Sequence, residues 1–140
     1  IGVNAVEQEK LENVSTLKTT ISQINRLKKG ETVGYNRRGI LEKDSVIATV
    51  AIGYADGYGR ELGNGNGSMM VNGKIAYVIG DVCMDMCMID ITGIDAHEGD
   101  EVIIFNNIPS LMRMAESMKT IPYEVLTSLS PRVKRVYLHE

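Results

Sequence analysis

Cysteine and histidine are scarce in this chain, with two residues of each among its 140 residues. No apolar run approaches the roughly 20 residues that a membrane-spanning helix requires, and no signal-peptide pattern opens the chain. These absences argue against a membrane protein and against a disulfide-stabilised secreted domain. We therefore expect a cytoplasmic protein with reduced thiols and no membrane partner.

The two cysteines and the two histidines also argue against a metal site. Cys83 and Cys87 lie four positions apart, and on a strand their Cα atoms would be about 13 Å apart. That distance is too long for a disulfide or a shared zinc ion. His97 falls in a polar turn and His139 lies near the C-terminus, away from other metal ligands. We expect no bound metal.

Positive charge is neither abundant nor concentrated. The formal net charge is −3 and the sequence pI is about 5.4. The densest basic group, Arg132, Lys134 and Arg135, is small, whereas nucleic-acid binding needs a concentrated positive face. We expect no nucleic-acid partner.

Short apolar segments separated by turn signals predict a mainly β fold. Asn72-Gly73 stands between two apolar runs, the strongest short signal for a β-hairpin. After Ser110 the apolar spacing becomes helical, and residues 123–129 predict a second short helix. This order predicts a Greek-key-like β-barrel with one or two short helices near the C-terminus. The predicted strands cover residues 14–24, 32–35, 44–54, 69–71, 74–79, 82–91, 101–105 and 133–138.

Four residues are candidates for more than packing. Asp56 follows a predicted buried strand, and a structural role capping the turn is the simplest interpretation. Asp85 would share a strand face with apolar neighbours, so its carboxylate needs an arginine, a backbone donor or a ligand. Structural pairing and a role in a site both remain open for Asp85. Spacing alone predicts a half-buried strand tyrosine at Tyr35 and a structural tyrosine at Tyr123.

Four stretches together resemble the C-terminal domain of alanine racemases, in matching order over about residues 14–137. The resemblance implies that residues 1–13 are a linker from a missing N-terminal (β/α)₈ barrel and that residues 14–140 are the β-domain. The opening Ile1 in place of a methionine also suggests a piece of a longer polypeptide. The four stretches are Gly30-Glu31-Thr32-Val33-Gly34-Tyr35, Ile52-Gly53-Tyr54-Ala55-Asp56-Gly57, Gly80-Asp81-Val82-Cys83-Met84-Asp85-Met86 and Thr120-Ile121-Pro122-Tyr123-Glu124.

The resemblance implies a pyridoxal-phosphate enzyme that interconverts L- and D-alanine for bacterial cell-wall peptidoglycan. Such enzymes work as head-to-tail homodimers, and a lysine of the N-terminal domain binds the cofactor covalently. Tyr35 matches the tyrosine that acts as acid or base in the partner subunit's active site, opposite that lysine. Because the lysine is absent here, the isolated domain is expected to be inactive.

The resemblance also assigns substrate and cofactor contacts. Tyr54 matches a tyrosine at the inner end of the substrate channel, and Arg60 matches an arginine of the same channel. Met84 matches a residue whose backbone amide meets the substrate carboxylate, and Asp85 belongs to the same wall. Tyr123 matches the tyrosine that hydrogen-bonds the cofactor phosphate.

One departure from the family pattern and three alternatives accompany this interpretation. Asp81 stands where many members have arginine, which should weaken steering of the substrate carboxylate. Some serine racemases carry asparagine in place of Tyr123, so the tyrosine here favours alanine. A related decarboxylase domain has a Cys-x-Ser-x-Asp motif, whereas Cys83 is followed by Met84 and Asp85. A non-catalytic dimerisation or ligand-binding barrel would leave Tyr35 dispensable.

Overall fold

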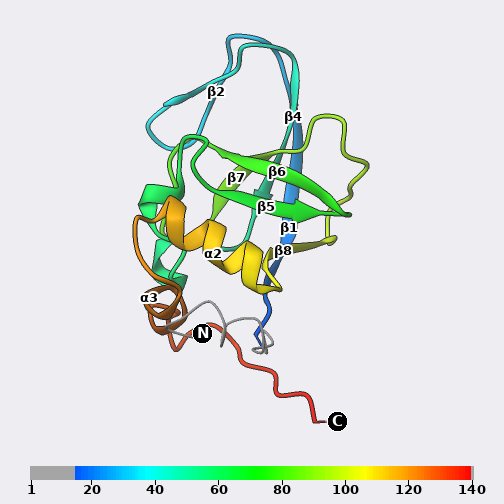
Figure 1. Ribbon diagram of the computed structural model, residues 1–140. Helices are drawn as coiled ribbons and strands as arrows, with labels where there is room; N and C mark the ends of the chain where they lie inside the picture. Colours follow the sequence, from blue (N-terminus) through cyan, green and yellow to red (C-terminus); the bar gives the residue numbers. More distant parts are fainter. Residues whose placement is uncertain (1–14, 140) are drawn as a thin grey trace.

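A closed antiparallel β-barrel forms the centre of the computed structural model, which describes residues 15–139 (Figure 1). The predicted mainly β barrel with two short C-terminal helices is therefore confirmed. The predicted linker, residues 1–13, lies outside the described residues. The strand order is β1 (Leu17–Leu27), β4 (Ser45–Val50), β7 (Cys87–Asp90), β6 (Lys74–Ile79), β5 (Ser68–Val71) and β8 (Glu101–Phe105).

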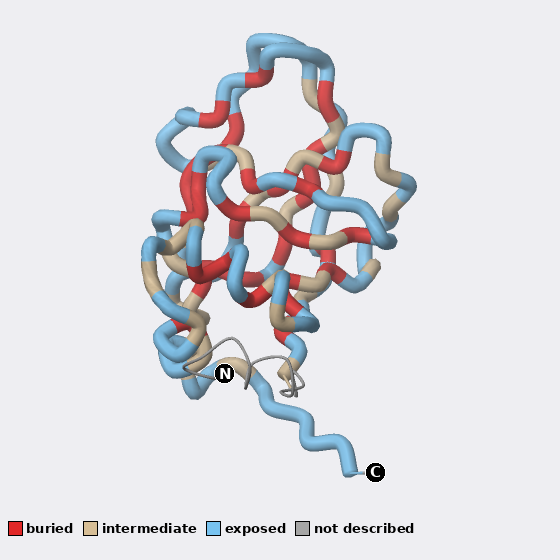
Figure 2. Tube along the Cα trace, viewed as in Figure 1, coloured by how far each residue is buried: buried red, intermediate tan, exposed pale blue. Residues whose placement is uncertain are grey.

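The barrel interior follows from the period of two along its strands. Met69 and Val71 of β5 and Cys87 and Ile89 of β7 are buried, and the residues between them are half-buried. Successive strand side chains point to opposite faces, so β5 and β7 send every second residue into the shared core. Buried residues gather in the barrel, whereas the C-terminal tail is exposed (Figure 2). Asn72-Gly73 joins β5 to β6 with both φ angles positive, 48° and 79°, as the predicted tight hairpin requires.

Strand β1 closes the barrel, because it pairs with two neighbours. Its first half pairs with β8 and its second half with β4. The pairing register with β4 shifts between Ile21 and Gln23, and such a shift bends a strand. The closed barrel leaves no free strand edge for a further segment.

A small hairpin, β2 (Thr32–Val33) and β3 (Gly39–Ile40), projects from the barrel at the top of Figure 1. Val33, Leu41 and Ile47 form a second buried cluster beneath it. Since Ile47 belongs to β4, this cluster fixes the hairpin on the barrel. The predicted strand at residues 32–35 is thus shorter than expected.

Two helices near the C-terminus confirm the prediction that the spacing of apolar residues becomes helical after Ser110. Helix α2 (Ile108–Ser117) begins with a capping box in which Ser110 N donates to Asn107 Oδ1 at 2.9 Å. Helix α3 (Pro122–Thr127) follows with Val125 buried. Within residues 15–139, no helix is both long and apolar enough to cross a membrane.

Two strand predictions were wrong. Residues 133–138 form no strand and leave the barrel as an extended, largely exposed tail (Figure 1); the barrel is closed by six strands without them. The predicted strand at residues 82–91 shortens to β7. Cys83 N donates to Met86 O at 2.9 Å, so Asp85 lies in a turn and not on a strand face.

Candidate active site

Tyr54 and Met84 lie side by side on two loops that meet through their backbones. Tyr54 begins the one-turn helix η1 (Tyr54–Asp56), and its N–H donates to Cys83 O at 3.0 Å. A Cβ atom on Gly53 would collide with the carbonyl oxygens of Cys83 and Met84, so only glycine permits this close approach. The Tyr54 and Met84 side chains remain 44% and 52% exposed.

Tyr35 projects from the turn between β2 and β3 with 88% of its surface exposed. The expectation of a half-buried strand tyrosine was therefore wrong, because the strand ends at Val33. The hairpin itself packs closely on the turn after β6. A Cβ atom on Gly39 would lie 2.9 Å from Gly80 N. Tyr35 is thus an exposed side chain on a supported loop.

Asp81 tethers that loop. Its buried carboxylate accepts hydrogen bonds from Asn64 Nδ2 at 2.8 Å and from Asn36 Nδ2 at 3.0 Å. Arg38 Nε lies 3.6 Å from Asp81 Oδ2. Hydrogen bonds from Asn64 and Asn36, then the charges of Arg38 and Arg60, lower the pKa of Asp81 from its ordinary value. Gly80, which precedes Asp81, packs against the hairpin that carries Tyr35. Cys83, two residues after Asp81, accepts the hydrogen bond from Tyr54 N.

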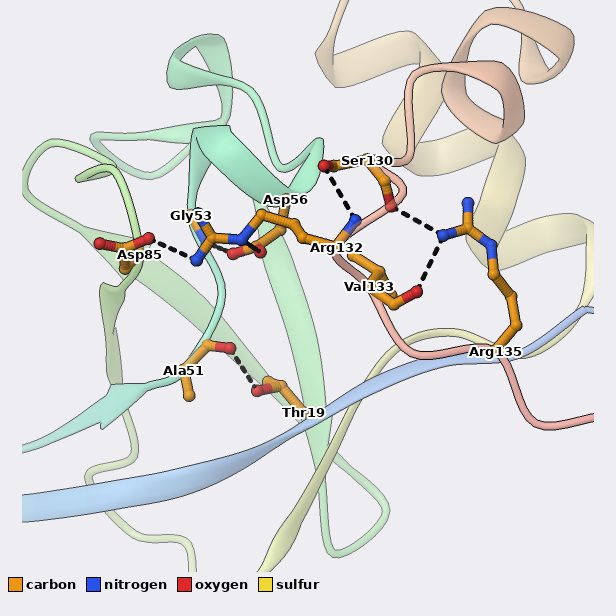
Figure 3. Close-up of polar contacts among 9 residues, drawn as sticks. All are labelled: Thr19, Ala51, Gly53, Asp56, Asp85, Ser130, Arg132, Val133 and Arg135. Atoms are coloured by element: carbon orange, nitrogen blue, oxygen red, sulfur yellow. Dashed lines mark hydrogen bonds and ion pairs between the residues drawn. The ribbon is translucent and has the colours of Figure 1, made fainter.

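Asp56 and Asp85 share one partner, Arg132 (Figure 3). Arg132 Nη2 lies 2.6 Å from Asp85 Oδ1, and Arg132 Nε lies 3.0 Å from Asp56 Oδ1. Asp56 also accepts a hydrogen bond from Gly53 N at 2.9 Å. The expected capping role of Asp56 is confirmed. Asp85 pairs with an arginine, which is one of the partners expected for it, but its side chain is 53% exposed and not buried on a strand face.

Sequence reasoning missed Arg132, Asn36 and Asn64. Arg132 was noticed only as part of a small basic group. It lies 47 positions from Asp85, and Asn36 lies 45 positions from Asp81. The expectation that Asp85 meets an arginine, a backbone donor or a ligand was the one related signal, and it did not single out Arg132.

Two further candidates are Arg60 and Tyr123. Arg60 is exposed at the start of the one-turn helix η2 (Arg60–Leu62). Tyr123 lies on α3 and is 49% exposed. Figure 1 shows α3 near the opposite end of the domain from the β2–β3 hairpin, so the chain does not bring Tyr123 together with Tyr35.

Where the Tyr54 and Met84 loops meet, one backbone N–H group is available to an anionic ligand. Among the residues that the structure describes, none accepts a hydrogen bond from the Met84 backbone N–H. An exposed amide of this kind can bind a carboxylate. Within residues 15–139, no group of three His, Cys, Asp or Glu side chains is placed to hold a metal ion. His97 is 78% exposed at its side chain.

The fold and the candidate site define a class of protein: a small β-barrel domain that carries exposed tyrosine and methionine side chains on its loops and on α3. Residues 14–137 match the family model described as alanine racemase, C-terminal domain. The chain belongs to this family.

Curated relatives support the same assignment. The chain is 45% identical over 132 residues to the alanine racemase of Helicobacter acinonychis, covering 91% of this chain and 35% of the relative. It is 44% identical over 142 residues to alanine racemase 1 of Clostridium acetobutylicum, covering 96% and 36%. The chain therefore spans about a third of the length of these relatives.

Solved structures agree with the fold. The alanine racemase of Streptomyces lavendulae superposes with a TM-score of 0.89 at 32% identity, covering 96% of this chain and 36% of that one. The alanine racemase of Bartonella henselae, solved with covalently bound pyridoxal phosphate, gives a TM-score of 0.81 at 34% identity, covering 88% and 34%.

Proposed function

We propose that this chain is the C-terminal domain of a pyridoxal-phosphate-dependent alanine racemase and that Tyr35 is its acid/base. The observation that carries the proposal is the Tyr35 side chain, 88% exposed on a hairpin fixed by a buried cluster and by Asp81. A proton-transfer group must reach a substrate outside its own domain and still be held in place. Tyr35 meets both requirements.

The cofactor would be held largely by the N-terminal domain. Its covalent lysine lies outside this chain, and Tyr123 would donate a hydrogen bond to the phosphate. The half-exposed phenol of Tyr123 fits that role. When bound, pyridoxal phosphate delocalises the negative charge that develops at the substrate α-carbon.

Racemisation needs a proton-transfer group on each face of the α-carbon. Tyr35 would serve one face and the lysine of the partner subunit the other. A phenol in water is a weak base at neutral pH, so it needs cations and exclusion of water to take a proton. Both would come from the domain that Tyr35 faces in a homodimer.

The substrate carboxylate would bind at the junction of the two loops. The free Met84 N–H would donate to it, while Tyr54 and Asp85 line the same wall. Arg60 would act in the outer channel by attracting the carboxylate. Tyr123 narrows the pocket, which favours alanine over serine.

The cellular role would be the supply of D-alanine for peptidoglycan in the bacterial cytoplasm. A homodimer is part of this proposal, because Tyr35 serves a site whose lysine belongs to another subunit. The position of α3 far from the β2–β3 hairpin supports it. One site that used both Tyr35 and Tyr123 would take them from two copies.

The test is to assay the full-length protein with pyridoxal phosphate and L-alanine, and to follow D-alanine by chiral chromatography. We expect interconversion by the full-length protein and none by the 140-residue chain alone. Faster turnover of serine would favour a serine racemase. Release of carbon dioxide without racemisation would favour the decarboxylase alternative. No turnover of any amino acid would favour a non-catalytic barrel.

A further inference from the structure

A single side chain from the C-terminal segment connects the two loops that carry Tyr54 and Met84 (Figure 3). The guanidinium of Arg132 uses Nη2 for Asp85 and Nε for Asp56, at 2.6 and 3.0 Å. The Asp56 side chain is 14% exposed, whereas those of Asp85 and Arg132 are about half exposed. The bridge therefore extends from the protein interior to the surface beside Met84.

We propose that Arg132 is a positioning residue for the substrate-carboxylate site. It holds the Tyr54 loop against the Met84 turn and neutralises the two carboxylates beside the Met84 amide. This inference rests on the proposed function, since it assigns Arg132 to the same substrate wall.

A closed set of contacts surrounds Asp56. One carboxylate oxygen of Asp56 fixes Gly53 N at 2.9 Å, the other meets Arg132, and its carbonyl accepts from Ser130 N at 3.0 Å. Ala55 N donates to Met84 O at 3.0 Å. The η1 turn is thus tied to the Met84 turn through its backbone and to the C-terminal segment through Asp56.

Arg132 itself is held in position by its own segment. Arg135 donates from Nη1 to Ser130 O at 2.7 Å and to Val133 O at 2.8 Å, and from Nη2 to Leu129 O at 3.2 Å. These bonds hold the backbone on both sides of Arg132, so the Arg132 side chain is positioned beside the two carboxylates. A preorganised side chain loses less conformational entropy when it bridges two loops.

The positive charge of Arg132 also affects binding of the substrate carboxylate. Without Arg132, Asp56 and Asp85 would present two uncompensated negative charges beside an amide that receives a carboxylate, and like charges repel. The hydrogen bond to Asp85 and then the charge of Asp56 raise the pKa of Arg132. The guanidinium therefore stays charged wherever its partners are ionised.

Arg132 acts on binding more than on proton transfer, because Tyr35 lies on a different loop with its own tether. In the full-length enzyme we expect Arg132→Gln to raise KM for alanine about tenfold and to lower kcat less than about threefold. Arg132→Lys keeps the positive charge but lacks the planar fork that spans two carboxylates, so its KM should lie between those of wild type and Arg132→Gln. Lys134→Gln removes the same charge from an exposed neighbour and should leave both constants unchanged.

A second measurement does not depend on racemase activity. Amide hydrogen exchange at Tyr54 and Ala55 reports whether the two loops stay joined. We expect both amides to exchange at least about tenfold faster in Arg132→Gln and Arg132→Lys than in wild type or Lys134→Gln.

Wild-type exchange at Tyr54 and Ala55 in both Arg132 variants would overturn the positioning role, and so would a wild-type KM. If the wild-type enzyme fails to racemise alanine, the proposed function fails, and exchange alone decides whether Arg132 joins the loops. If Arg132→Gln does not fold, Arg132→Lys retains the charge and gives the same two readouts.

Discussion

The buried carboxylate of Asp81 accepts a hydrogen bond at 3.0 Å from the side-chain amide of Asn36, the residue that follows Tyr35. Asp81 also accepts from Asn64 and lies near Arg38. The aspartate that departs from the family's arginine therefore supports the loop that presents Tyr35. Its expected effect on steering of the substrate stays a prediction.

Replacing Asp81 should reduce proton transfer. Asp81→Asn removes one acceptor and points an amide at the donors of Asn36 and Asn64. Because small misplacements of a reacting group are costly, we expect kcat for alanine to fall about tenfold with KM changing less. Steady-state kinetics on the full-length enzyme measures both. Glu42→Gln, an exposed carboxylate beyond the hairpin, is the matched control; equal kcat values for the two variants would contradict the tether.

The tether should also depend on pH. Hydrogen bonds from Asn64 and Asn36 lower the pKa of Asp81 in the folded protein. Because the pKa of Asp81 is lowered on folding, its carboxylate stabilises the folded protein at pH values above the ordinary pKa of an aspartate. This stabilisation is lost as the pH falls through the pKa that Asp81 has in the folded protein. We expect the protection factor of the Arg37 amide, which donates to Gly34 O, to fall over that acidic interval after correction for the intrinsic exchange rate. Asp81→Asn should abolish the pH dependence; an unchanged profile in that variant would assign it to another group.

Gly53→Ala should separate the two loops of the substrate wall. The added methyl group meets the carbonyl oxygens of Cys83 and Met84, and overpacking of this kind costs about 3 kcal/mol. Gly99→Ala faces open space and carries only the cost of its positive φ, about 1 kcal/mol. Chemical denaturation compares the free energies of unfolding. A smaller loss for Gly53→Ala than for Gly99→Ala would argue against the close approach.

The two cysteines should differ in reactivity. Burial raises the pKa of Cys87 to about 12, and Cys83 is only partly buried. Since the thiolate is the nucleophile, a raised pKa leaves Cys87 almost wholly in its unreactive thiol form at pH 8. In the folded 140-residue chain, iodoacetamide should label Cys83 first, and Cys87 only after unfolding. Peptide mass spectrometry reads the sites; rapid labelling of Cys87 in the folded chain is the opposing result.

Local patterns predicted the strands well where a turn signal fixed their ends. Asn72-Gly73 placed β5 and β6 correctly, and the helical spacing after Ser110 located α2. The strand predicted at residues 133–138 did not form. Its apolar residues do not alternate strictly, and β1 and β8 already pair to close the six-stranded barrel without it.

The site was predictable only in part. The expectation that Asp85 lies buried on a strand face was wrong, because its side chain is 53% exposed in a turn, yet Asp85 does pair with an arginine, Arg132. Spacing could not identify that partner, since the contact joins residues 47 positions apart. Nothing in the local pattern at Tyr35 indicated an exposed side chain, and its role came from family resemblance alone. Long-range contacts carry no periodic signal along a chain.

The central claim is that Tyr35 transfers a proton on one face of the substrate α-carbon. Tyr35→Phe keeps the ring and removes the hydroxyl, so racemisation by the full-length enzyme should fall at least about a hundredfold with pyridoxal phosphate still bound. In deuterium oxide, the variant should keep exchanging the α-proton of one alanine enantiomer through the opposite lysine and lose exchange of the other. Wild-type racemisation and exchange of both enantiomers in Tyr35→Phe would contradict the account.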